Sequence, residues 1–166
     1  MKRVYELSMV HKLPTQLPLQ PSFRHLTTVL QANDFNPEKT SAYFLTLSSS
    51  TADKEKIAGR ISLAAYWIKN YAPEDFKYEV QDNPQEIHLS PLQRTVLEKV
   101  SKLLQDEKEY DEVALHSAFC AICKEHGMEN REFFQLMYHI IINKERGPKL
   151  AAFILTLGKR RVAQIM

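Results

Sequence analysis

The chain has 166 residues, a length typical of one compact domain or two small ones, and 44% of it is hydrophobic, which is enough for a core. Four glycines are too few for a turn-rich β protein, and no apolar run of about 20 residues marks a membrane span. The formal net charge of +2 identifies no partner by itself.

The start of the chain is expected to form an extended strap, because residues 1–20 mix prolines with apolar residues and show no helical period. This segment also lacks the sustained apolar stretch of a signal peptide. The two cysteines, Cys120 and Cys123, lie three residues apart, and reduced thiols are the default interpretation. We therefore expect a cytoplasmic protein with no membrane partner.

Three helices are predicted in the first half of the chain, each with apolar residues at helical spacing. Ser22 is suited to cap the first helix, and Asn36 followed by Pro37 opens the second. Residues 48–50 are expected to end the second helix, and Asp53 is expected to cap the third.

A linker is predicted at residues 73–89, which contain Pro73, Pro84, many charges and the short alternating segment FKYEV. This linker is the most plausible boundary between subdomains. We therefore divide the chain into an N-terminal helical connector, residues 1–89, and a C-terminal helical subdomain, residues 90–166.

The second half is predicted to contain further helices separated by glycine and proline. Ser90 starts a strongly amphipathic helix, and the next helix ends at Gly127. Asn130 is expected to cap a helix that the Gly147-Pro148 pair breaks, and Gly158 separates the last two short helices. The predicted fold is all-α, a helical bundle of about seven or eight helices in two subdomains.

One cluster contains residue types that can bind a metal. His116, Cys120 and Cys123 fall at i, i+4 and i+7 on one helical face, with His126 close by. Structural zinc sites usually draw ligands from two chain segments, so a site built on one straight helix is geometrically poor. Buried free thiols are the favoured interpretation, and neither a metal nor a cofactor is expected on this segment.

An acidic run lies between two predicted helices, at Glu107, Glu109, Asp111 and Glu112. A carboxylate pair for acid–base catalysis is one interpretation. A solvated turn is favoured, because acidic residues stabilise the start of the following helix.

The end of the chain is strongly basic. From residue 144 onward there are six cations and one anion, a net charge of +5. The cations are Lys144, Arg146, Lys149, Lys159, Arg160 and Arg161. Such clustering is typical of a surface that binds a polyanion, although a solubilising tail is an alternative. Lys144 and Arg146 would also be favourable near a helix end through the helix dipole alone.

Three stretches resemble class I lysyl-tRNA synthetases in the order in which that family has them. The segment FFQLMYHIIINKERGPKLAAFILTLGKRRVAQIM resembles the last two helical hairpins, and more loosely those of bacterial-type glutamyl-tRNA synthetases. PSFRHLTTVLQ is similar to a Pro-Phe-Arg-His-Leu stretch with Ser22 inserted, and AAYWIKNYAPEDFKYEV is similar to a tryptophan-containing helix followed by Ala-Pro-Glu. Together with the lead-in VYELSMVHKLP, they favour the lysine enzyme.

The resemblance implies an α-helical cage that holds the anticodon loop of tRNA-Lys. The family's His-Ile-Gly-His and Lys-Met-Ser-Lys-Ser signatures are absent here, so ATP binding and lysylation would belong to an upstream catalytic domain. The six basic residues of the end, together with Arg24, are the implied tRNA-binding residues. Arg146 is expected to read a base, whereas Arg24 could instead cap an interior turn.

Other interpretations remain open. The chain could be the corresponding region of a glutamyl-type synthetase or a freestanding paralogue. A helical protein-interaction module with a basic end is a further alternative. A small helical enzyme is disfavoured, because no constellation of nucleophile and base is present.

Overall fold

The computed structural model describes residues 19–46, 51–81 and 87–166. Within these ranges there are eight α-helices and no strand, which confirms the all-α fold. The helices are α2 (Phe23–Ala32), α3 (Pro37–Leu45), α4 (Thr51–Tyr71), α5 (Pro91–Gln105), α6 (Glu112–His126), α7 (Asn130–Ile142), α8 (Leu150–Leu157) and α9 (Lys159–Ile165). The strap predicted before residue 19, the helix end at 48–50 and Pro84 lie outside the described residues.

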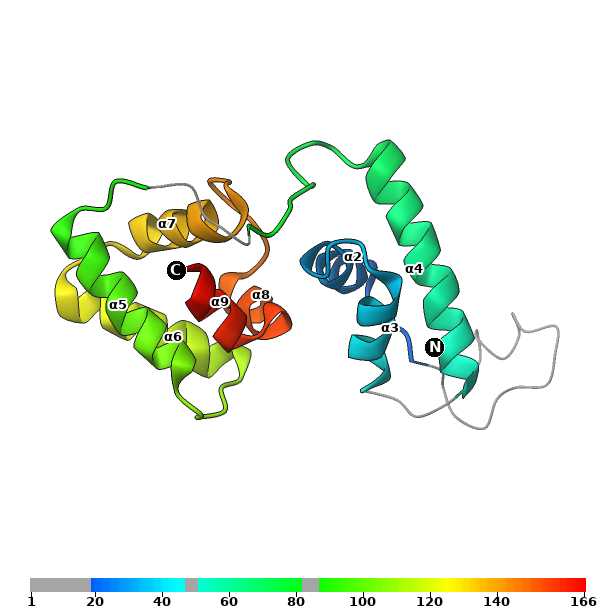
Figure 1. The fold of residues 1–166 in the computed structure, drawn as a ribbon, viewed down its shortest axis with the longest axis horizontal. Coiled ribbons are helices and arrows are strands. Elements are labelled where there is room, and N and C mark those ends of the chain that lie inside the picture. Colours follow the sequence, from blue (N-terminus) through cyan, green and yellow to red (C-terminus); the bar gives the residue numbers. More distant parts are fainter. Residues whose placement is uncertain (1–18, 47–50, 82–86) are drawn as a thin grey trace, which may run out of the picture.

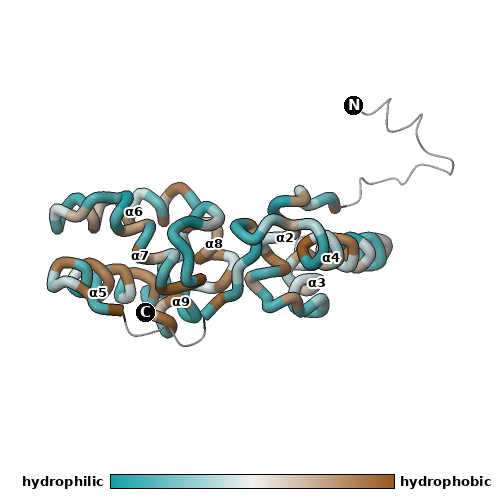
Figure 2. The backbone as a smooth tube through the Cα atoms, turned by 90° about the horizontal axis from the view of Figure 1, so that it is seen from above, coloured by the Kyte–Doolittle hydropathy of each residue, from teal (hydrophilic) through white to brown (hydrophobic). Residues whose placement is uncertain are grey.

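The helices form two groups that lie side by side, α2 to α4 in one and α5 to α9 in the other (Figure 1). Helix α4 lies on the outer side of the first group, and the chain after it returns toward the second. The view from above shows the same arrangement, with α2 and α8 facing each other where the groups meet (Figure 2). The structure therefore brings α2, near the start of the described chain, into contact with α8, near its end.

The N-terminal group is built around the inner face of α4, which packs on α2 and α3. Ile57, Ile61 and Ile68 of α4 are buried against Leu30 and Phe44. Their positions along α4 place them on one side of the helix. Burial of this apolar stripe is what holds the three helices together.

The predicted helix starts at Ser22, Asn36 and Ser90 are confirmed. Each side-chain oxygen accepts a hydrogen bond from the backbone N–H three residues later, at 3.2, 2.9 and 3.2 Å. Ser90 belongs to a full capping box, because the Gln93 side chain accepts from the Ser90 N–H in return.

The predicted cap at Asp53 is wrong. Helix α4 already begins at Thr51, so Asp53 lies within its first turn. Its Oδ1 atom accepts a hydrogen bond from the backbone N–H of Leu19, 3.0 Å away, and the residue is buried. The carboxylate therefore anchors the incoming chain.

Helix α7 differs from its prediction at both ends. It begins at Asn130, preceded by Glu129, and no side chain caps it, so the predicted asparagine cap is wrong. It ends at Ile142 because Asn143 adopts a left-handed conformation with φ of 49°, which asparagine tolerates better than most residues. The helix therefore stops before Gly147-Pro148 is reached.

The turn after α7 folds back onto the helix it leaves. The hydroxyl of Tyr138 donates to the carbonyl of Pro148 at 2.5 Å. A Cβ atom on Gly147 would lie 2.9 Å from the Ile142 side chain and 3.0 Å from the Tyr138 ring. A larger residue at this position would have to displace these two side chains.

The predicted linker contains an extended segment that packs on the C-terminal group. Tyr78 and Val80 are buried in the same cluster as Leu115, Phe133 and other residues of α5 to α9. The N–H of Gln81 donates to the carbonyl of Ile141 at 2.8 Å. The domain boundary after residue 89 stays a prediction, but side chains before it contribute to the C-terminal core.

Candidate nucleic-acid interface

An open cleft of about 850 Å³ lies where the two groups of helices meet. One wall comes from α2, another from α8 and the turn before it, and the third from residues 73–78. Its lining includes three cations, two carboxylates and three aromatic rings. They are Arg24, Arg146, Lys149, Asp75, Glu112, Phe76, Tyr78 and Phe153.

Three of the seven predicted tRNA-binding residues are brought together in this cleft. Arg24 comes from α2, whereas Arg146 and Lys149 come from the turn before α8. Both arginines are exposed, and in the described part of the chain neither guanidinium forms a hydrogen bond or an ion pair. Both arginines are therefore free to bind an incoming anion or a planar base.

The third cation, Lys149, is paired with a carboxylate. Its Nζ atom lies 3.1 Å from Oε1 of Glu112, the first residue of α6. The side chains are 84% and 45% exposed, so this pair adds little to stability. Glu112 and Lys149 lie at the point where the main cleft meets a second pocket, since both residues line each of the two.

Four predicted residues lie elsewhere and make contacts within the chain. Lys144 donates to the carbonyl of Glu74 at 2.7 Å, and Arg161 donates to the carbonyl of Ala32 at 3.3 Å. These two contacts link the C-terminal group to the segment and helix that precede it. Of the six cations of the basic end, Arg146 and Lys149 line the cleft and the other four do not.

The remaining two cations belong to α9. Lys159 donates to the carbonyls of Asp106 and Lys108 and lies 5.2 Å from the centre of the Tyr110 ring. Arg160 lies 3.9 Å from Glu107, and both side chains are at least 80% exposed. The role in tRNA binding assigned from sequence to these residues and to Lys144 and Arg161 stays a prediction.

Tyr78 is the residue at the junction that sequence reasoning missed. Its N–H donates to the side-chain carbonyl of the buried Gln31 at 3.0 Å, and its hydroxyl donates to the carbonyl of Thr28 at 3.1 Å. The ring meets Phe153 of α8 edge to face, with centroids 5.4 Å apart. Tyr78 thus contacts α2 and α8 at once.

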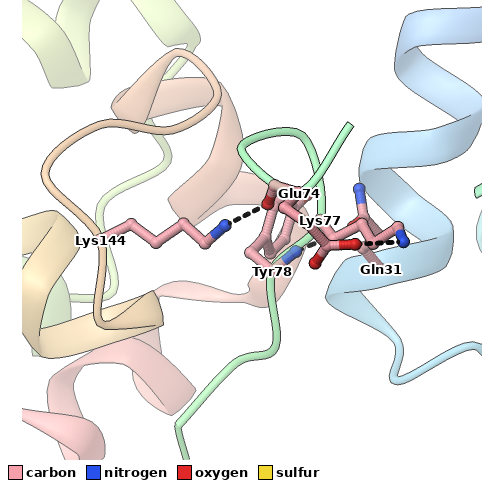
Figure 3. Close-up of polar contacts among 5 residues, drawn as sticks. All are labelled: Gln31, Glu74, Lys77, Tyr78 and Lys144. Carbon is pink, nitrogen blue, oxygen red and sulfur yellow. Dashed lines mark hydrogen bonds and ion pairs between the residues drawn. The ribbon is translucent and has the colours of Figure 1, made fainter. Parts of the chain in front are cut away.

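Figure 3 shows this junction, with Gln31 on one side of Tyr78 and Lys144 on the other. Lys77 donates to Glu74 at 2.7 Å, and this hydrogen bond holds the pKa of Glu74 below its usual value. Burial raises the pKa of Tyr78 well above that of a free tyrosine. The alternation in FKYEV was the available signal, because it places Tyr78 and Val80 on one face.

The second pocket, of about 450 Å³, lies between α6, α7 and the start of α8. His116 and Phe134 line it, and their rings are parallel to within 6° with centroids 5.5 Å apart. Its other lining residues are Glu112, Val113, Tyr138, Lys149, Leu150 and Ala151. The pocket therefore combines a stacked pair of rings, apolar walls and one ion pair.

Cys120 contacts His116, which lines this pocket. Cys123 is buried as predicted, and burial raises the pKa of its thiol. The prediction for Cys120 is wrong, because that residue is only partly buried and its Sγ atom lies 3.6 Å from Nε2 of His116. Across the described ranges, no group of three or more His, Cys, Asp or Glu residues is arranged to hold a metal ion.

No helix in the described segments is both long and apolar enough to cross a membrane.

An all-α module with an open, partly basic cleft between two helical groups has the features of a protein that binds a polyanion. Residues 60–164 match the model of the anticodon binding domain family, and the chain belongs to this family.

The chain is similar to lysine–tRNA ligases from archaea and bacteria. It is 32% identical over 164 residues to that of Pyrococcus horikoshii, covering 96% of this chain and 31% of the relative. It is 33% identical over 167 residues to the enzyme of Thermococcus kodakarensis, covering 98% of this chain and 32% of the relative. It is 34% identical over 169 residues to the enzyme of Borrelia garinii subsp. bavariensis, covering 99% of this chain and 32% of the relative. The chain thus spans about a third of these relatives, and the resemblance to lysyl-tRNA synthetases is confirmed.

Proposed function

We propose that this chain binds the anticodon loop of tRNA-Lys as the C-terminal module of a class I lysyl-tRNA synthetase. ATP-dependent lysylation would then be carried out in the cytoplasm by an upstream catalytic domain. The family match and the similarity to lysine–tRNA ligases support this proposal.

The observation that carries the proposal is the convergence of Arg24 with Arg146 and Lys149 in one cleft. An anticodon loop is single-stranded and polyanionic, and proteins read such loops by pairing cations with phosphates and planar groups with bases. The cleft offers cations, and the partly exposed ring of Phe76 also lines it. The two carboxylates limit its positive charge, which favours recognition of particular groups over general attraction.

The three cations differ in what they offer to RNA. Arg24 projects from a helix that lies outside the matched family region, and we assign it to the phosphate backbone. Arg146 stands beside Gly147 in the turn before α8, and its side chain is exposed. We assign Arg146 to a base, because a guanidinium can stack and form two hydrogen bonds in one plane.

The test measures binding of tRNA anticodon stem-loops to the full chain at several salt concentrations. Arg24→Ala should weaken lysine and non-lysine anticodons alike and flatten the slope of log K against log salt by roughly 0.7 for each lost phosphate contact. Arg146→Ala should relax discrimination at one anticodon position, at a cost of about 1–3 kcal/mol.

Arg131→Ala is the matched control, because Arg131 is exposed on α7 and does not line the cleft. It should leave the anticodon preference unchanged and reduce no more than the general attraction for RNA. If Arg146→Ala keeps full affinity and full anticodon preference, the base-reading assignment is wrong. If the unmodified chain shows no preference for lysine anticodons, the proposed function fails.

A further inference from the structure

Helix α4 presents apolar side chains to solvent on the side that faces away from α2 and α3. Leu63 and Tyr66 are 71% and 59% exposed, and neither residue lines the cleft or the second pocket. Figure 1 shows α4 on the outer side of the N-terminal group. Large apolar side chains that lie next to each other on an exposed helix face indicate an interaction surface.

The polar side chains beside these two residues already have partners within α4. The hydroxyl of Ser62 donates to the carbonyl of Ala58 at 3.2 Å. The side-chain amide of Asn70 donates to the carbonyl of Tyr66 at 2.8 Å. A second helix can therefore cover this face without leaving these donors unpaired, and the small side chains of Ala58 and Ser62 allow it to approach closely.

One anion and one cation mark the two ends of this exposed face. Glu55 and Lys69 are 14 residues apart, close to four helical turns, and Ser62 lies midway between them on the same side of the helix. In the described part of the chain, neither charge takes part in an ion pair. Lys54 and Lys56 are each about 100° away from Glu55 around the helix axis, so they lie at the sides of the face.

We propose that this face of α4 pairs with the same face of a second copy of the chain, in an antiparallel arrangement about a two-fold axis near Ser62. The two-fold axis brings Glu55 of each copy beside Lys69 of the other, which gives two intermolecular ion pairs. Tyr66 of each copy then lies over Ala58 of the other, because both residues are four positions from Ser62. A parallel pair would instead place like charges together.

The charges favour a second copy over a partner whose surface has a single sign, because such a partner could attract only one end of the face. Pairing through α4 also leaves RNA binding unobstructed, since no residue of α4 lines the cleft or the second pocket. The inference is therefore independent of the proposed function.

The test measures the mass of the full chain by sedimentation equilibrium at concentrations from about 10 μM to about 500 μM. One pair of helix faces is smaller than a standard protein interface, so we expect a dissociation constant on the order of 10–100 μM. Leu63→Ser and Tyr66→Ser should each raise it on the order of 10-fold. Val113→Ser is the matched control, because Val113 is 74% exposed on α6, and it should leave the constant unchanged.

Reversal of the charges tests the antiparallel arrangement. Glu55→Lys and Lys69→Glu should each weaken the dimer on the order of 10-fold, because each places like charges together at both ends. The double variant with both changes should restore it. Glu98→Lys makes the same change in net charge as Glu55→Lys at an exposed position on α5, and it should have no effect. Circular dichroism confirms that each variant stays helical.

The inference is overturned if the unmodified chain stays monomeric over this range, or if Leu63→Ser and Tyr66→Ser both dimerise as the unmodified chain does. Failure of the double variant to regain the affinity lost in the single variants would also overturn it. Each of these outcomes leaves the proposed function intact, because binding of the anticodon stem-loop is measured separately.

Discussion

Replacing Tyr78 with phenylalanine tests whether the junction between the two helical groups depends on a buried phenol. The change removes the hydrogen bond to the Thr28 carbonyl, which is 3.1 Å long, and leaves the ring contact with Phe153 in place. A single hydrogen bond of this kind contributes about 1 kcal/mol net. At neutral pH the variant should therefore be less stable by about 1 kcal/mol, or roughly 2–4 °C in melting temperature.

The same substitution should behave differently at alkaline pH. Burial raises the pKa of Tyr78, so the folded protein keeps the phenolic proton at a pH where the unfolded chain, with a tyrosine pKa of about 10, releases it. Above about pH 10, Tyr78 therefore lowers the free energy of unfolding by about 1.4 kcal/mol for each pH unit, and the variant lacks this contribution. The variant's deficit of about 1 kcal/mol should disappear near pH ~11.

Urea unfolding followed by circular dichroism at about pH 7 and about pH 11 measures both effects. Tyr71→Phe is the control, because Tyr71 is 66% exposed on α4 and its loss should change stability by less than about 0.5 kcal/mol. An equal deficit for Tyr78→Phe at both pH values would refute the argument. It would mean that the phenol titrates as readily in the folded protein as in the unfolded chain.

Three further substitutions and one assay test the fold and the proposed function. Gly59 lies inside α4 with open space where a Cβ atom would stand, so Gly59→Ala should stabilise the chain by about 0.5–1 kcal/mol in urea unfolding. Gly158→Ala should destabilise it by about 1–2 kcal/mol, because φ is +91° there; an unchanged midpoint would contradict this. Ser90→Ala removes an N-cap and half of the capping box and should cost about 1 kcal/mol, whereas no loss would show that Pro91 suffices to start α5. The purified chain should not catalyse lysine-dependent exchange of pyrophosphate into ATP, and measurable exchange would place a catalytic site on this segment.

Helix starts and stops could be predicted where a residue acts on its immediate neighbours. Ser22, Asn36 and Ser90 each bond to the N–H three residues later, so short stretches of sequence contain all the relevant partners. Gly127 ends α6 with φ of 71° for the same local reason, since glycine adopts this conformation without strain. The prediction for Asp53 was wrong because the group that it binds, the N–H of Leu19, is far away in the chain.

The candidate site was only partly predictable. A count of charges identified the basic end, but it could not show that Lys144 and Arg161 are used to hold the two helical groups together. It also could not predict that Arg24 and Arg146 line the same cleft, or that the cations of α9 do not line it. These outcomes depend on which carbonyls and carboxylates the folded chain brings near each cation.

By itself, the sequence determined the helical class, most helix boundaries and the family resemblance, because helical periodicity, caps and motifs depend on residues within a few positions of one another. The tertiary structure decided that α2 lies against α8, with Tyr78 between them, and so created the cleft that Arg24 shares with Arg146. The physical reason is that packing joins residues from distant parts of the chain through the shapes of their side chains. Local sequence patterns do not predict which two apolar helix faces will pack against each other.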